Sequence, residues 1–190
     1  MLMGGAAFAL FSDQATSNDN TFSSGNADLV IANDVPPGNP DTYADSVAGV
    51  SVTDMVPGQV ETKDFWLKND SSGSFSMDLT VDLDDLQGSD TSVLVDELMV
   101  MFTCDTDNNG LGDGTDTSTA EKSVQDWLDD LPVALGSVGA NQVASNATTD
   151  SDQDELICRM TATLPEDSDN DAAGKDLSFD GLFNGIQVAP

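Results

Sequence analysis

Hydrophobic and polar residues alternate along several parts of the chain, most regularly over residues 75–83. Because successive side chains of a strand point to opposite faces, this pattern puts the apolar residues on one face and the polar residues on the other. Strands with one solvated face are typical of antiparallel sheets. Apolar patterns of strand length also predict strands over residues 28–32, 47–53, 60–68, 94–104, 156–164 and 177–188.

One helix is predicted near residue 120. Ser118 followed by Glu121 has the spacing of a capping box, in which both side chains bind free backbone N–H groups of the first helical turn. Pro132 ends the predicted helix. Its apolar stripe consists of Val124, Trp127, Leu128 and Leu131.

The connections between the predicted strands are rich in Pro, Gly and Asp, as at residues 34–41 and 56–59. A chain of 190 residues is long enough for one domain with its own core. We therefore expect an all-β fold, in which residues 21–190 form a single antiparallel β-sandwich with one short helix. Residues 1–20 are expected to form an extended N-terminal arm and linker.

Two blocks of residues resemble the TasA/camelysin family. The first block comprises Phe8-Ala9-Leu10-Phe11-Ser12-Asp13 and Thr21-Phe22-Ser23-Ser24-Gly25-Asn26-Ala27-Asp28-Leu29, although Asn26-Ala27 stands where the family usually has Thr-Leu. The second comprises Met55-Val56-Pro57-Gly58-Gln59 and Thr62-Lys63-Asp64-Phe65-Trp66-Leu67-Lys68-Asn69. The resemblance implies a secreted, jelly-roll-like protein that builds extracellular fibres in bacteria or bundling pili in archaea.

Two interpretations of the apolar lead, residues 1–11, remain open. Ala7-Phe8-Ala9 has the small-x-small form of a signal-peptide cleavage site, so the lead is either the tail of a discarded signal or a working part of the protein. As a working part, it suits a donor strand that completes the sheet of the next copy. The predicted donor residues are Ala6, Ala7, Phe8, Ala9, Leu10 and Phe11, and residues 12–20 are the predicted linker.

The net charge of the chain limits the classes of molecule that it can bind. The chain has 35 acidic residues, 5 basic residues and no histidine, for a net charge of -30. This excludes a nucleic-acid partner, because almost nothing in the chain neutralises phosphates. A carboxylate-rich surface is typical of a halophile, because self-repulsion is screened in brine, where the Debye length is about 3 Å at 1 M salt. No apolar run of about 20 residues predicts a membrane span.

Residues 105–116 have the spacing of a twelve-residue calcium loop, with glycine at the sixth position and oxygen donors around it. The last position holds Asp where a bidentate Glu is usual, and the loop joins a strand to the predicted helix. A solvated acidic turn is the alternative in a chain this rich in Asp. The predicted calcium ligands are Asp105, Asp107, Asn109, Leu111 (through its carbonyl), Asp113 and Asp116.

Three further sites follow from short patterns. Cys104 and Cys158 lie on separate predicted strands without zinc-like spacing, so a disulfide is expected if the chain is exported, and two free buried thiols are the alternative. Asn69 and Asn146 begin N-glycosylation sequons that we expect in surface loops, although such short patterns also arise by chance.

Catalysis is not expected. Without histidine, the usual general base for a serine or cysteine nucleophile is missing. A pair of carboxylates is a weak signal of glycoside hydrolysis in a chain with 35 acidic residues.

The sequence therefore predicts a secreted structural protein whose partners are copies of itself. In the leading hypothesis, the donor strand of one copy joins the next head-to-tail, which gives a pilus or matrix fibre that is open to lateral association. The alternative is a monomeric calcium-binding module that adheres to a cell surface.

Overall fold

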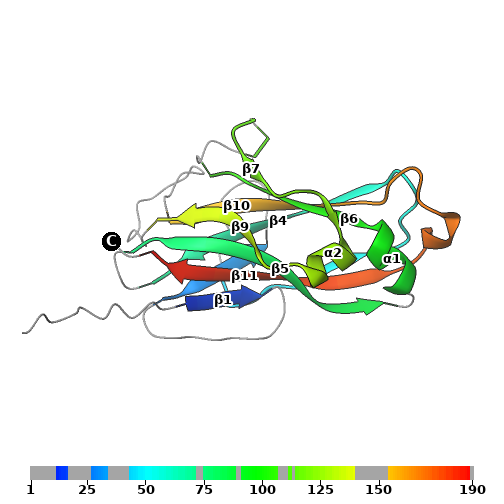
Figure 1. Cartoon of the computed structure of the whole chain (residues 1–190). Helices are drawn as coiled ribbons and strands as arrows, with labels where there is room; N and C mark the ends of the chain where they lie inside the picture. Colours follow the sequence, from blue (N-terminus) through cyan, green and yellow to red (C-terminus); the bar gives the residue numbers. More distant parts are fainter. Residues whose placement is uncertain are drawn as a thin grey trace, which may run out of the picture.

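The computed structural model describes residues 12–16, 27–33, 43–71, 75–88, 91–106, 111–112, 114–139 and 154–188. Two antiparallel sheets pack face to face, and the short helices α1 and α2 lie at the end of the sandwich opposite to the end of β11 (Figure 1). The elements are β1 (Ser12–Thr16), β2 (Leu29–Asn33), β3 (Val50–Val52), β4 (Val60–Asn69), β5 (Met77–Gly88), α1 (Thr91–Glu97), β6 (Met99–Cys104), β7 (Thr117–Ser118), β8 (Lys122–Ser123), α2 (Val124–Asp129), β9 (Val133–Val138), β10 (Glu155–Thr163), the 3₁₀-helix η1 (Asn170–Ala172) and β11 (Leu177–Gln187).

The strands of the two sheets come from all parts of the chain. The first sheet has the order β1-β11-β5-β9, and β3 also pairs with β11. The second sheet has the order β2-β4-β10-β6-β7, and β8 also pairs with β6. The prediction of an all-β, antiparallel sandwich is confirmed.

The core lies between the sheets. Alternate residues of β5 are buried, as the pattern over residues 75–83 predicts. Aromatic rings connect the layers: Phe183 of the first sheet lies 5.5 Å from Phe65 and 6.0 Å from Phe102, measured between ring centroids. Trp127 of α2 packs on the edge of this cluster, with its ring 5.5 Å from that of Phe102.

The predicted short helix is present as α2, and the described residues contain a further helix, α1, that was not predicted. Residues 91–97, which overlap the strand predicted over 94–104, form α1, and β6 begins only at Met99. Leu94 and Leu98 lie one helical turn apart and are both buried. A short apolar run is compatible with either a strand or a helix, and here its first part forms a helix. The predicted capping box is wrong, because the N-cap of α2 is Ser123, whose Oγ accepts a hydrogen bond from Asp126 N.

Two strands have no clear alternating pattern. In β9 the pairing with β5 is interrupted next to Gly136, which has a φ of +134°, so the buried residues Leu135 and Val138 are three positions apart. Such a bulge hides the period of two. β1 has the polar sequence SDQAT, predicted as a linker, and it pairs with β11 instead.

Candidate assembly site

The outer edge of β11 is shared by two short strands. β5 pairs with β11 along one side, from Leu177 to Gln187. On the other side, β3 pairs with residues 177–179 and β1 pairs with residues 182–186. We call the edge of β11 over residues 182–186 the β11 slot, and in this structure β1 of the same chain fills it.

β1 is held on one side only. Among the described strands its partner in the sheet is β11, so its far edge carries backbone groups without a described ladder partner. The nearest strand of the second sheet is β2, itself an edge strand. β1 therefore lies where the margins of the two sheets meet, which is a position from which a strand leaves without disturbing the central ladders.

The side of the β11 slot that faces the core is lined by Phe183 and Gly185, and little space remains next to Gly185. In the register of β1, Ala15 is opposite Phe183 and Asp13 is opposite Gly185. Phe183 is fully buried, and a Cβ atom added to Gly185 would lie only 2.8 Å from Met77 Sδ. An acidic residue of β1 thus stands in register with a buried glycine of β11.

The predicted donor residues, Ala6, Ala7, Phe8, Ala9, Leu10 and Phe11, lie outside the described residues. The adjoining residues 12–16 are a strand and not the linker that the sequence suggests. Sequence reasoning missed this edge because a five-residue polar strand has no period of apolar residues.

The two motif blocks meet in space. β2 and β4 pair with Leu29 opposite Asn69. Asp28 N donates to Ser71 Oγ at 2.8 Å, and Asp70 N donates to Asp28 O at 2.9 Å. The described end of the first block, at Asp28 and Leu29, and the end of the second block, at Asn69, therefore meet in one junction between the start of β2 and the end of β4.

Asn69 is the centre of this junction. Its side chain is fully buried, and Nδ2 donates to Phe75 O and Gly139 O, both at 2.8 Å, while Oδ1 accepts from Ser71 N at 3.3 Å. These bonds tie the end of β4 to the segments next to β5 and β9. The prediction that Asn69 lies in a surface loop is wrong, because it is the last residue of β4, and a glycan has no room on its amide in the folded protein. Asn146 lies outside the described residues.

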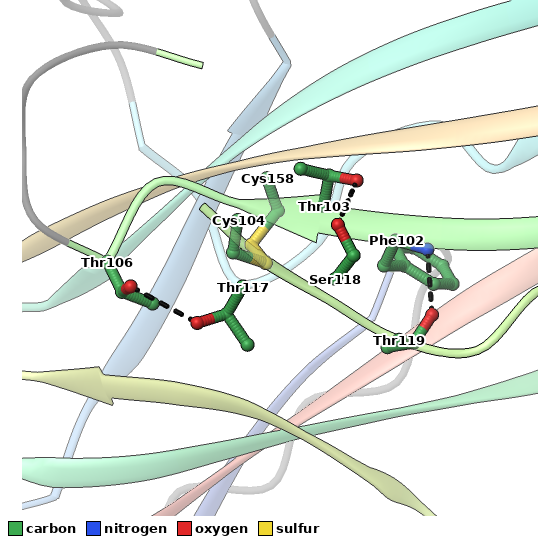
Figure 2. The surroundings of a disulfide bond; sticks show 8 residues. All are labelled: Phe102, Thr103, Cys104, Thr106, Thr117, Ser118, Thr119 and Cys158. Atoms are coloured by element: carbon green, nitrogen blue, oxygen red, sulfur yellow. Dashed lines mark hydrogen bonds between the residues drawn. A yellow bond between two sulfur atoms is a disulfide. The ribbon is translucent and has the colours of Figure 1, made fainter. Parts of the chain in front are cut away.

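The disulfide between Cys104 and Cys158 is confirmed (Figure 2). The two residues are directly opposite each other in the β6–β10 pair, and both are fully buried. Beside the disulfide, Phe102 N donates to Thr119 Oγ1 at 3.0 Å, and the Thr103 and Ser118 hydroxyls are 2.9 Å apart. The disulfide therefore cross-links β6 and β10, two neighbouring strands of the second sheet.

The calcium loop stays a prediction. Of its expected ligands, Asp105, Leu111 and Asp116 are described, whereas Asp107, Asn109 and Asp113 lie outside the described residues. Asp105 is buried, and Asp116 Oδ2 accepts from Gly112 N at 2.5 Å within the loop. Over the described ranges, no group of three or more metal-binding side chains comes together.

The few basic residues are engaged within the fold. Lys63 donates to Ala48 O at 2.6 Å and Gly49 O at 2.8 Å, and Lys122 and Asp130 form an ion pair of 2.6 Å. Arg159 makes two hydrogen bonds of 2.6 Å to the carboxylate of Asp64. Lys68 lies 3.9 Å from Glu155, and Lys175 also has a partner.

Among the residues that the structure describes, Lys63 and Asp82 have shifted pKa values. Burial lowers the pKa of Lys63 from its model-compound value of 10.5, and the Asp180 carboxylate opposes this effect. Burial raises the pKa of Asp82 above 3.8; the Leu83 N–H opposes the shift and the Asp84 charge adds to it. Sequence reasoning missed Lys63 and Asp180 because they come from different sheets and are far apart in the chain.

The chain matches a protein-family model over almost its whole length. The family model described as camelysin metallo-endopeptidase matches residues 1–189. No curated protein matches the chain. Within the described ranges, no helix is long and apolar enough to cross a membrane.

The name of the matching family implies a catalytic metal, and the donor set of this chain does not fit the zinc ion of a peptidase. Protein ligands of a peptidase zinc ion typically include histidines, and the chain has none. Its two cysteines are joined in the disulfide. We therefore derive no reaction through a metal, and the expectation that the chain is not an enzyme stays a prediction.

Proposed function

The chain belongs to the TasA/camelysin family of secreted fibre-forming and matrix proteins, and from this premise we propose that it is the structural subunit of an extracellular filament. In this proposal, the N-terminal segment of one copy pairs with the β11 slot of the next. The observation that supports it is β1 itself, a short polar strand that fills the margin of its own sheet.

Strand exchange conserves the ladder. When the N-terminal segment of a second copy replaces β1, the main chain of residues 182–186 regains the same kind of partner, so the exchange costs few hydrogen bonds. The gain comes from side chains, because the predicted donor Ala6–Phe11 is apolar whereas residues 12–16 include Asp13 and Gln14. Burying an apolar side chain contributes about 1.5 to 3 kcal/mol, so the apolar donor is the better occupant of the slot.

The exchange propagates in one direction. The donor and the slot are different surfaces, so a contact between two copies leaves one free donor and one free slot. Such head-to-tail contacts do not close on themselves and give a filament. The net charge of -30 makes copies repel one another at low salt, so the filament forms best in concentrated salt.

The test compares three chains by negative-stain electron microscopy and analytical ultracentrifugation in 2 to 3 M salt, a range chosen for strong screening. These are the full chain, a chain that begins at Ser12, and a chain that begins at Asn20. We expect filaments from the full chain only, and monomers from the chain that keeps β1 but lacks the donor. A full chain with Phe8→Asp and Leu10→Asp is the matched control for the apolar character of the donor, and it should also stay monomeric.

Filaments from the chain that begins at Asn20 would contradict the donor role of the N-terminal segment. If the full chain stays monomeric in salt, with and without calcium, the filament proposal fails. A calcium-dependent rise in Tm without a change in mass would then support the monomeric surface module.

A further inference from the structure

The outer faces of the two sheets differ in charge. In β5 of the first sheet, the residues that point away from the core include Asp78, Asp82 and Asp84, and the residues of β11 opposite them add no basic side chain. In the second sheet, β4, β10 and β6 lie side by side, and directly opposite residues form rows across the three strands. Those rows present a different set of side chains to the solvent.

Two adjacent outward-facing rows of the second sheet contain no charged residue. Met160 and Phe102 are opposite each other, buried, and face the core, so the residues next to them in β10 and β6 face outward. One outward row consists of Val60, Thr163 and Met99, and the next consists of Thr62, Thr161 and Met101. All six are partly or largely exposed, and we call them the neutral face.

The row that follows the neutral face is electrically balanced. It consists of Asp64, Arg159 and Thr103. Arg159 donates two hydrogen bonds of 2.6 Å to the carboxylate of Asp64, so this row adds one acid and one base. The neutral face is therefore continued by an ion pair, in a chain whose net charge is -30.

The neutral face also exposes apolar surface. Val60 is 52% exposed, and Val56, in the turn that leads into β4, is 54% exposed. Met99 and Met101 are partly exposed, and the flexible side chain of methionine adapts to varied surfaces. Removing this surface from water favours association with another surface of low charge.

We propose that the neutral face is a docking surface for a second copy of this chain, which packs on it through its own neutral face. The choice of occupant follows from charge. Acidic surfaces of two copies repel each other, whereas two neutral faces meet without placing like charges opposite each other. A basic partner would be drawn instead to the first sheet, with Asp78, Asp82 and Asp84. Because the contact is symmetric, each residue of the face occurs in it twice.

A single contact of this kind is weak. The neutral face comprises six residues, whereas a stable interface involves about 20 to 30 residues on each side. We expect a dissociation constant on the order of 1 mM in concentrated salt, so dilute chains without a working donor stay monomeric. In a filament, which rests on the proposed function, many neutral faces act together and pair filaments side by side.

Sedimentation equilibrium measures this contact without filament growth. The protein is the full chain with Phe8→Asp and Leu10→Asp, which disable the donor. In concentrated salt, we expect a monomer–dimer equilibrium as the protein concentration approaches about 1 mM. Thr161→Asp puts a negative charge on the middle strand of the neutral face, twice in each dimer, and should raise the dissociation constant by about tenfold or more.

Thr80→Asp is the matched control. Thr80 points outward from β5, an inner strand of the first sheet, and it is partly exposed like Thr161. The substitution adds the same charge to the other outer face, so it should change the dissociation constant by no more than about twofold. Thr62→Asp is the second variant of the neutral face, and it decides the question if Thr161→Asp does not fold.

Two results would overturn the inference. One is a donor-disabled chain that stays monomeric up to that concentration, which would leave the neutral face to a different partner. The other is a dimer that Thr80→Asp weakens as much as a folded variant of the neutral face does.

The proposed function is tested separately. With an intact donor, the full chain with Thr161→Asp should still form single filaments by negative-stain electron microscopy but lose their side-by-side pairing. If the full chain forms no filaments in salt while the donor-disabled chain still dimerises, the proposed function fails and the docking surface stands.

Discussion

The centre of the second sheet and the outer margin of the first sheet are held in very different ways. β10 pairs along its length with β4, and over Cys158–Thr163 also with β6, to which the disulfide joins it. β1 pairs with β11 over five residues on one side and contributes no long apolar run. The difference indicates that the central ladders contribute more to the stability of the domain than the pairing of β1 with β11 does.

Removing the disulfide tests the contribution of the centre of the second sheet to stability, and it has the largest expected effect. Cys104 and Cys158 are 54 residues apart, and closing a loop of that length contributes about 4 kcal/mol in the chain-entropy account. We expect Cys104→Ala with Cys158→Ala to lower the free energy of unfolding by about that amount, measured by urea unfolding in high salt. The chain that begins at Asn20 is the control, and its free energy of unfolding should fall by a smaller amount. If removing β1 lowered the free energy of unfolding more than removing the disulfide, the margin of the first sheet would contribute more to stability than the disulfide of the second sheet.

Asn69→Ala has the next largest expected effect. The substitution leaves Phe75 O, Gly139 O and Ser71 N without their partner in a fully buried position, which costs about 2 to 3 kcal/mol. Urea unfolding measures the loss. Ser137→Ala, which removes an exposed hydrogen bond to Asp78, is the control and should cost less than about 0.5 kcal/mol. Equal losses in the two variants would show that the junction of the motif residues contributes no more than a surface contact.

Asp82→Asn has the smallest expected effect and the opposite sign. Asp82 is opposite Leu182 of the β11 slot, and its folded pKa is raised by burial. The folded state then binds the proton more tightly than the unfolded state, so the ionised carboxylate disfavours folding at neutral pH and the penalty disappears as pH falls through the folded pKa. Asn keeps an oxygen for the Leu83 N–H, so we expect a gain of at most about 0.5 kcal/mol at pH 7 that vanishes toward pH 3.

The measurement is Tm against pH in 1 M salt, which screens the general repulsion between carboxylates. Glu121→Gln removes an exposed charge and serves as the control. A gain from Asp82→Asn that persists at low pH would contradict the assigned cause.

The regular part of the fold is predictable from the sequence, whereas its margins are not. The alternation over residues 75–83 and 156–164 predicts β5 and β10 because each strand has one buried face. The only apolar residue of β1 is Ala15, and β9 has a bulge, so neither strand has the period on which a prediction depends.

The candidate site is less predictable for a related reason. The cysteine pair can be inferred because two cysteines on strands have few alternatives in a secreted protein. Asn69 has the pattern of a surface sequon, but its burial depends on Phe75 and Gly139, which the sequon does not involve. Lys63 and Asp180 come close together only because the two sheets stack, and no local sequence pattern indicates this proximity.

The engagement of all five basic residues within the fold has a consequence for the material that such a protein would form. Each Lys and Arg has a partner in its own chain, and the net charge of -30 that remains is balanced by counterions from the medium. An assembly of these subunits would be a polyelectrolyte, and its mobile counterions would exert an osmotic pressure. A mat of such fibres would swell when the surrounding brine is diluted and contract when the brine is concentrated.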